Sequence, residues 1–106
     1  MSPPTYQLSH EVQDTALVVR ASGKFDREAA VAVEALILPH AGLRILNLAA
    51  VEYISSSGIA GLVKLSARAG LRIASPAECV RNALSLAGIE PILSIFPDEV
   101  SARASR

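Results

Sequence analysis

The chain has 106 residues, of which 51% are hydrophobic and 19% are charged, and its ten basic and ten acidic side chains cancel to a formal net charge of zero. This length suits one hydrophobic core, because two separate cores would each be too small to offset the loss of chain entropy. The balanced charge argues against a nucleic acid partner, and no apolar run approaches the roughly 18 residues of a membrane span.

The cysteine content and the first residues bear on the compartment. Cys79 is the only cysteine, so it has no internal disulfide partner, as is usual in a reducing compartment. Residues 1–4, Met-Ser-Pro-Pro, lack the basic and apolar regions of a secretory signal. We therefore expect a cytoplasmic protein without membrane insertion, folded as a single domain over residues 1–106.

Hydrophobic periodicity and turn residues predict nine elements. In chain order they are strands over residues 6–11 and 16–21, a helix over 27–38, a strand over 43–48, a helix from the serines at 55–57 to 69, a strand over 71–74, a helix over 76–87, a strand over 92–96 and a helix over 98–104.

Caps and breakers set several of these boundaries. Gly23 is expected to end the second strand, and Asp26 to cap the first helix. Gly70 ends the second helix. Ser75 is a candidate cap for the third helix, with Pro76 at its first position.

The predicted order is β-β-α-β-α-β-α-β-α. Strand-helix-strand units require crossovers, which force parallel pairing and place helices against the sheet. The sequence therefore predicts an α/β domain with a mixed sheet of about five strands and about four helices. Residues 43–48, Leu-Arg-Ile-Leu-Asn-Leu, are typical of a central strand buried on both faces.

A serine cluster marks the candidate site. Ser55, Ser56 and Ser57 lie between the carboxyl end of the central strand and a helix start, where open α/β sheets place binding sites. The unpaired N–H groups and dipole of a helix N-terminus accommodate a phosphate. Serines are also common at helix starts simply as caps, and the residues alone leave both interpretations open.

Several motifs together resemble the STAS domain of bacterial anti-sigma factor antagonists. In order, they are Gly23-Lys24-Phe25-Asp26, Asn47-Leu48, Ser55-Ser56-Ser57-Gly58, Ala74-Ser75-Pro76 with Val80, and Leu86-Ala87-Gly88-Ile89. The series covers almost the whole chain in the family's order. A STAS-like fold and the function of an anti-sigma factor antagonist are what this resemblance implies.

The resemblance also implies roles for individual residues. Ser56 matches the serine that a kinase-type anti-sigma factor phosphorylates, and a serine phosphatase of the PP2C type would reverse the reaction. Ser57 would help cap the helix, and Gly58 would allow close approach of the partner. The full set expected to contact the partner is Asp26, Ser55, Ser57, Gly58, Ile59, Gly61 and Leu62.

One position departs from the family pattern. Ser55 stands where the family has an aspartate before the phosphoacceptor. This change predicts either altered kinase recognition or constitutive binding, or makes Ser55 a second acceptor. It also motivates an alternative function, a STAS subunit that is not phosphorylated and that belongs to an ABC-type lipid-transport system or another assembly.

Catalytic interpretations are weaker. The serine cluster lacks the first glycine of the Gly-x-Ser-x-Gly elbow of serine hydrolases. His10 and His40, the two histidines, are distant in sequence from the cluster, and Cys79 lies on the apolar face of its predicted helix. Gly58-x-x-Gly61 is too short for a nucleotide-binding loop. We therefore expect no catalytic residue, cofactor or metal.

Overall fold

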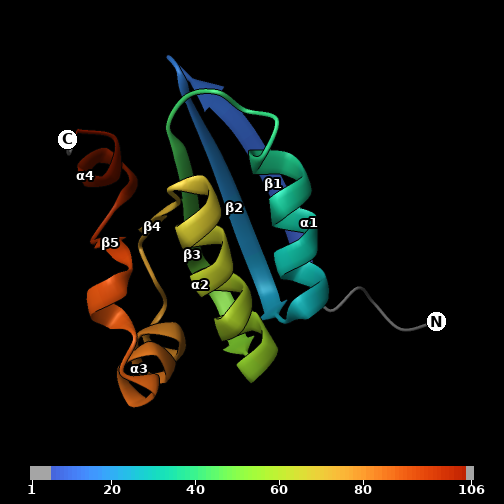
Figure 1. Ribbon diagram of the computed structural model, residues 1–106, viewed down its shortest axis with the longest axis vertical. Helices are drawn as coiled ribbons and strands as arrows, with labels where there is room; N and C mark the ends of the chain where they lie inside the picture. Colours follow the sequence, from blue (N-terminus) through green and yellow to red (C-terminus); the bar gives the residue numbers. More distant parts are fainter. Residues whose placement is uncertain (1–5, 105–106) are drawn as a thin grey trace.

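The computed structural model describes residues 6–104 and, within that range, has the predicted order of elements (Figure 1). They are β1 (Tyr6–Gln13), β2 (Ala16–Phe25), α1 (Arg27–Ile37), β3 (Arg44–Ile54), α2 (Ser56–Ala69), β4 (Arg72–Ala74), α3 (Glu78–Ala87), the 3-10 turn η1 (Glu90–Ile92), β5 (Ser94–Phe96) and α4 (Glu99–Ala104). This confirms the α/β class with a five-stranded mixed sheet and four helices over the described residues. The segment 1–4, for which no secretory signal is predicted, lies outside them.

The strands are ordered in the sheet as they are in the chain, β1-β2-β3-β4-β5. The first pair is an antiparallel hairpin, and the other strands run parallel to one another. With sequential order and crossovers of one hand, α1, α2 and α3 pack against the same face of the sheet. Figure 1 shows α1 and α2 side by side over β2 and β3.

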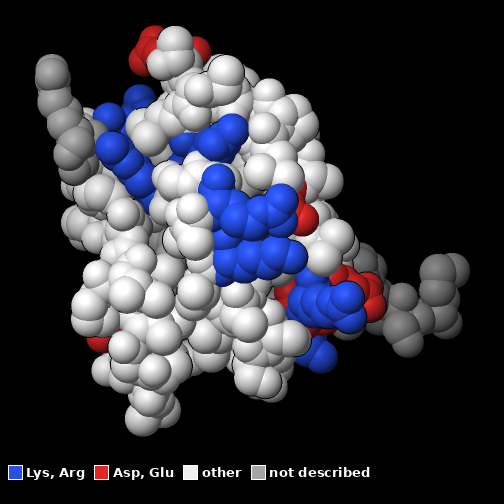
Figure 2. Space-filling model, viewed as in Figure 1, with Lys and Arg blue, Asp and Glu red and all other residues white. Residues whose placement is uncertain are grey.

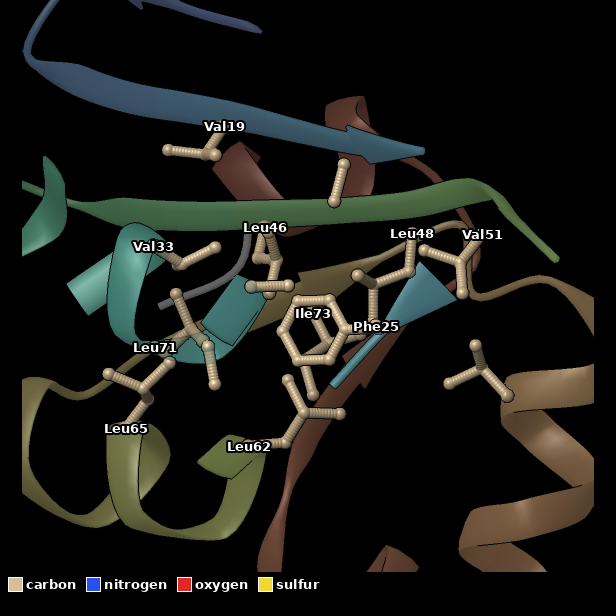
Figure 3. Close-up of a cluster of buried hydrophobic side chains, with 14 of the residues drawn as sticks. Val19, Phe25, Val33, Leu46, Leu48, Val51, Leu62, Leu65, Leu71 and Ile73 are labelled. Atoms are coloured by element: carbon tan, nitrogen blue, oxygen red, sulfur yellow. The ribbon is translucent and has the colours of Figure 1, made fainter. Parts of the chain in front are cut away.

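The main core lies between this face and the three helices. Leu46 and Leu48 of β3 meet Phe25 at the end of β2, and Leu62 of α2 packs on the other side of the Phe25 ring (Figure 3). All four side chains are essentially inaccessible to solvent. Burial of large apolar side chains at this point ties the ends of β2 and β3 to the first turns of α2.

The other face of the sheet has a smaller core under α4. Its buried members are Ala16, Val18, Ile45, Ala74 and Ala102. β3 is therefore buried on both faces along its first part, as predicted, with Ile45 facing α4 and Leu46 facing α2.

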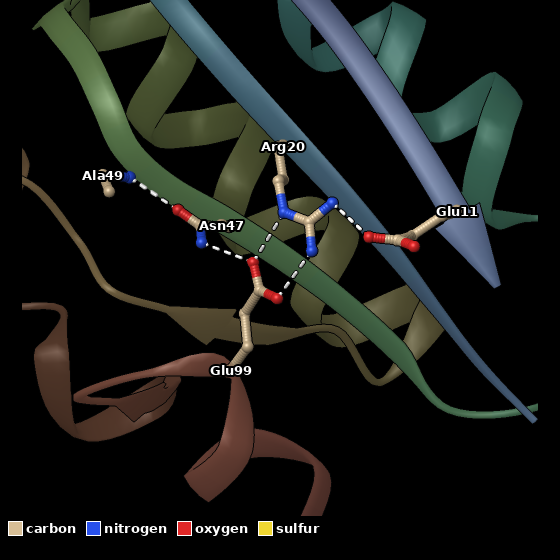
Figure 4. Close-up of polar contacts among 5 residues, drawn as sticks. All are labelled: Glu11, Arg20, Asn47, Ala49 and Glu99. Atoms are coloured by element: carbon tan, nitrogen blue, oxygen red, sulfur yellow. Dashed lines mark hydrogen bonds and ion pairs between the residues drawn. The ribbon is translucent and has the colours of Figure 1, made fainter. Parts of the chain in front are cut away.

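A polar network holds α4 against this second face (Figure 4). The Arg20 Nη2 and Nε donate to the two carboxylate oxygens of Glu99 at 2.8 and 2.9 Å, and the Asn47 Nδ2 donates to Glu99 at 2.6 Å. Arg20 also pairs with Glu11 of β1. Hydrogen bonds from Arg20 lower the pKa of both the Glu99 and the Glu11 carboxyls, so the network is ionised at neutral pH.

Three predicted boundaries are wrong. The central strand was predicted to end at Leu48, but β3 continues to Ile54, since its later residues still pair with β2 as far as Phe25. Gly23 does not end β2: it adopts φ 81° beside a register shift against β3, and the strand continues to Phe25. Ser75 does not cap α3, because its backbone turns to φ 50° and its N–H donates to Phe96 O. The helix begins at Glu78 after Ala77, without a side-chain cap.

Within residues 6–104, no helix combines the length and apolar character needed to cross a membrane. The same residues contain no group of three or more His, Cys, Asp or Glu side chains arranged to hold a metal ion.

Candidate functional site

The candidate site lies where β2 and β3 end and α1 and α2 begin. Asp26 follows β2 and caps α1, as predicted, accepting a hydrogen bond of 3.0 Å from Ala29 N. Ser55 follows β3 and donates its backbone N–H to Phe25 O at 3.0 Å. The starts of the two helices are therefore joined through the end of β2.

Ser55, and not Ser57, is the side chain that caps α2. Its hydroxyl accepts a hydrogen bond of 3.0 Å from Gly58 N, the donor three residues on. The prediction that Ser57 caps the helix is wrong, because Ser57 already lies inside the first turn. Its hydroxyl is 3.0 Å from that of Ser55, and the two form a hydrogen-bonded pair.

Ser56 is the first residue of α2 and is exposed. Its hydroxyl makes no hydrogen bond to any residue within 6–104. The amide N–H groups of this first turn have no acceptor inside the helix and carry the positive end of its dipole. The Ser56 oxygen is thus exposed and makes no hydrogen bond to the described residues.

Gly58 serves internal packing. A Cβ atom at this position would lie 2.2 Å from Phe25 O and 2.9 Å from Phe25 C, so only glycine lets α2 start this close to the end of β2. Gly58 is buried, as is Leu62, which is 0% exposed. Both residues pack in the interior, and their predicted contact with a partner stays a prediction.

The remaining predicted contact residues divide between surface and core. Ile59 is half-buried and packs on the main core. Gly61 faces α1, where a Cβ atom would lie 2.5 Å from that of Ala30, so it sets the close approach of the two helices. Asp26, Ser55 and Ser57 line a surface hollow of ≈ 570 Å³.

That hollow contains charged residues that sequence reasoning missed. Lys24 and Arg27 supply positive charge, and Glu28 joins Asp26 in supplying negative charge. The Lys24 Nζ also lies 5.8 Å from the centre of the Tyr53 ring. Lys24 belongs to the motif Gly23-Lys24-Phe25-Asp26 and Arg27 follows it directly, so the position of the motif in the sequence was the available signal.

A second hollow of ≈ 280 Å³ continues along the seam between α1 and α2. Val31 and Ala60 line it, and Arg27 and Lys64 contribute the cations at its margin. Ser57 borders both hollows, whereas Ser56 borders neither. Together they form one groove that begins beside the serine cluster.

The histidines and the cysteine are not at this groove. The His40 Nε2 lies 2.8 Å from Thr15 O, next to the β1–β2 turn, and His10 lies on β1. The Cys79 Sγ donates to Val51 O at 3.4 Å and packs against the core. None of the three is among the residues that line either hollow.

Comparison with known families gives one match, to the STAS domain, over residues 7–102. No curated protein matches the sequence.

Several solved structures are similar over nearly their whole length. An anti-sigma factor antagonist from Mycobacterium paratuberculosis has a TM-score of 0.81 at 21% identity, covering 97% of this chain and 96% of that one. The antagonist SpoIIAA in its unphosphorylated form has a TM-score of 0.68 at 21% identity, with 92% of each chain covered. The Bacillus SpoIIAA in its phosphorylated form gives 0.64 at 19%, covering 95% of this chain and 99% of that one.

A sulfate transporter family protein from Wolinella succinogenes has a TM-score of 0.70 at 17% identity, covering 87% of this chain and 84% of that one. At these identities the likeness shows a common fold.

Proposed function

Because the chain belongs to the STAS domain family, we propose that it is an anti-sigma factor antagonist that binds a kinase-type anti-sigma factor and is switched off by phosphorylation of Ser56. The observation that carries the proposal is the exposed Ser56 hydroxyl at the first position of α2, which makes no hydrogen bond to the described residues; its neighbour Ser57 borders the groove between the two helices. Structural neighbours named as anti-sigma factor antagonists support it, and one of them is solved both without and with phosphate.

The proposed chemistry belongs to the partner kinase, and this chain is its protein substrate. The Ser56 Oγ would attack the γ-phosphorus of ATP, forming a new P–O bond while the bond to ADP breaks and the serine proton passes to a base on the kinase. A serine phosphatase of the PP2C type would hydrolyse the ester. In this proposal the chain is a cytoplasmic regulator with no catalytic residue and no cofactor of its own.

The effect of phosphorylation follows from where Ser56 lies. A phosphate adds about −1.5 to −2 charges at pH 7 to a position that is otherwise neutral and exposed. The free N–H groups of the first turn stabilise it locally, so the fold tolerates it. A docked partner would have to desolvate it or oppose its charge, and a misplaced charge in an interface costs several kcal/mol.

The neutral cap has a further consequence. Ser55 supplies the α2 cap without a negative charge, whereas an aspartate would supply both. A kinase that approaches Ser56 therefore meets one fewer acidic neighbour. We propose that this changes the selectivity of phosphorylation and leaves the switch itself intact.

The test compares Ser56→Glu, Ser56→Ala and the control Ser57→Ala in binding to the serine-kinase anti-sigma factor of the same organism. Ser56→Glu adds about half the charge of a phosphate and should weaken binding by at least about tenfold, whereas Ser56→Ala should bind as wild type does. Mass spectrometry after incubation with kinase and ATP should place phosphate on Ser56 and none on Ser56→Ala. Unchanged binding of Ser56→Glu would contradict the switch.

A second candidate is an interaction subunit of an ABC-type lipid-transport system or another assembly, without phosphorylation. The serine in place of the acidic residue at position 55 favours it, and a sulfate transporter family protein shares the fold. This candidate predicts co-purification with transporter ATPase or permease subunits and no phosphate on residues 55–57 in protein isolated from growing or stressed cells.

A further inference from the structure

The outer face of α2 is a continuous stripe that begins at the proposed phosphoacceptor. The exposed residues of this helix are Ser56, Ser57, Ala60, Lys64, Ala67 and Arg68. Their spacing of three and four residues places them on one side of the helix. The opposite side is buried through Gly58, Leu62, Leu65 and Ala69. We call these six exposed residues the α2 stripe.

The charge of the α2 stripe has one sign. α2 contains Lys64 and Arg68 and no acidic residue, so the helix carries two positive charges. Arg27 of α1 borders the same groove as Lys64. Figure 2, in the orientation of Figure 1, shows basic atoms gathered over α2, whereas the basic atoms at the neighbouring end of α1 have acidic atoms beside them.

The cations differ in how far they are already neutralised. Arg68 Nη1 pairs with Glu34 Oε2 of α1 at 3.1 Å, although the Arg68 side chain remains 53% exposed. Neither Lys64 nor Arg27 has an ion pair with any residue in the range 6–104. These two cations are therefore free to bind an external carboxylate.

The surface between the cations is small and apolar. Ala60 and Gly61 leave the groove shallow, and the exposed Val31 of α1, 56% accessible, forms its other wall. Small side chains let another backbone approach closely, and the apolar wall offers area to bury. Arg27, Lys64 and Glu34 border this apolar surface, and Glu34 is already paired with Arg68, so the unpaired charges at the rim are the two cations.

We infer that the α2 stripe and the groove beside it bind an acidic segment of the anti-sigma factor, with carboxylates on Lys64 and Arg27 and an apolar residue against Val31 and Ala60. This inference rests on the proposed function and names the chemistry of the partner surface. Charge complementarity selects the partner, because Lys64 and Arg27 are unpaired cations beside the groove, whereas Glu34, its one acidic lining residue, is paired with Arg68.

The same stripe explains how a phosphate on Ser56 acts over a distance. Lys64 lies eight residues beyond Ser56, about 12 Å along the helix at 1.5 Å per residue, so it does not neutralise the phosphate by direct contact. A phosphate of about −1.5 to −2 brings the two positive charges of α2 to a sum near zero. The surface that attracts an acidic partner would then lose its attraction and gain a local repulsion.

The experiment measures association of the full-length chain with the serine-kinase anti-sigma factor of the same organism, by surface plasmon resonance from about 50 to about 300 mM salt, where screening changes most. Lys64→Glu should lower the affinity by about tenfold, mainly through the association rate, and should flatten its salt dependence. The milder Lys64→Gln should fall between it and wild type. Arg81→Glu on α3, an exposed cation on another helix, is the matched control and should change the affinity by less than about twofold.

The outcomes separate this inference from the function on which it rests. If Lys64→Glu and Lys64→Gln bind as wild type does while Ser56→Glu does not, the antagonist function stands and the acidic contact is wrong. If Lys64→Glu instead loses binding only to vesicles of an anionic phospholipid, the stripe binds a membrane surface and the inference is overturned. If wild type does not bind the kinase at all, both fail.

Discussion

The closest packing in the site makes Gly58→Ala a sharp test of its geometry. The new Cβ atom would lie 2.2 Å from Phe25 O, whereas real Cβ atoms do not approach other atoms within 3.0 Å. The Phe25 oxygen belongs to the backbone and no rotation about a side-chain bond moves a Cβ atom, so neither group can turn away. The start of α2 must therefore move by about 0.8 Å or more within a close-packed region.

The expected cost follows from two opposing effects. Overpacking of this kind costs about 1–3 kcal/mol, and stretching the hydrogen bonds from Gly58 N to Ser55 and from Ser55 N to Phe25 adds about 1 kcal/mol. Alanine gains up to about 1 kcal/mol over glycine in a helix. We expect a net loss of about 2 kcal/mol, equivalent to a fall in Tm of roughly 10 °C for a domain of this size.

Urea denaturation followed by circular dichroism measures this loss. The matched control is Gly88→Ala, because that glycine has φ 70° but no atom within 4 Å of an added Cβ, so it incurs only the left-handed backbone cost of about 1–2 kcal/mol. Nuclear magnetic resonance spectra of Gly58→Ala should show shifts concentrated at the start of α2 and at Phe25. A Gly58→Ala protein as stable as wild type would refute the packing argument.

Two further changes test the polar contacts. Glu99→Gln should destabilise the fold by about 1 kcal/mol at pH 7, limited by solvent around the partly exposed Arg20. The pKa of Glu99 is lowered in the fold, so its contribution is present above the unfolded pKa and disappears as the pH falls through the folded pKa. The difference in urea midpoint between Glu99→Gln and wild type should therefore begin to shrink as the pH falls below about 4 and continue to shrink at lower pH, with Glu52→Gln as the control. A constant difference down to about pH 2 would argue against an ionic role. Ser55→Ala should cost about 1 kcal/mol through loss of the α2 cap, while Ser55→Asp should retain full stability, and equal thermal midpoints for both variants would contradict the capping assignment.

The order of helices and strands was predictable because capping and turn residues mark the same element boundaries as the hydrophobic periodicity does. Asp26 and Gly70 show this agreement: each occupies the cap position that its chemistry favours, and the structure has a cap at each. The sequential order of the strands follows from short crossovers, which leave each new parallel strand beside the previous one.

The boundaries that failed were decided by contacts distant in sequence. Gly23 is a breaker by local rules, but pairing with β3 carries β2 past it to Phe25. Ser75-Pro76 has the local pattern of a helix start, but a hydrogen bond from Ser75 N to Phe96 O of β5 holds the chain away from the helix for two more residues. Neither partner can be identified from the neighbouring sequence.

The location of the candidate site was predictable from the sequence, whereas the roles of its individual side chains were less so. The motif located the serine cluster at the start of α2. Which serine caps the helix depends on where the last residue of β3 falls, and that moved the cap from Ser57 to Ser55. Leu62 was expected to contact the partner, yet its side chain is fully buried in the core. Helical periodicity contained the signal for Lys64, which lies on the opposite face.

The carbonyl oxygen of Phe25 accepts a hydrogen bond from Ser55 N and lies close to where a Cβ atom of residue 58 would be. This one peptide group therefore fixes the position of the start of α2 relative to the start of α1. Since that group belongs to the main chain, the aromatic residue can be exchanged without removing it, whereas the glycine cannot acquire any side chain at all. Sequence drift in such a protein is therefore restricted at position 58 more than at position 25. A sequence that loses this glycine will have repositioned α2, and its serine, relative to the first helix.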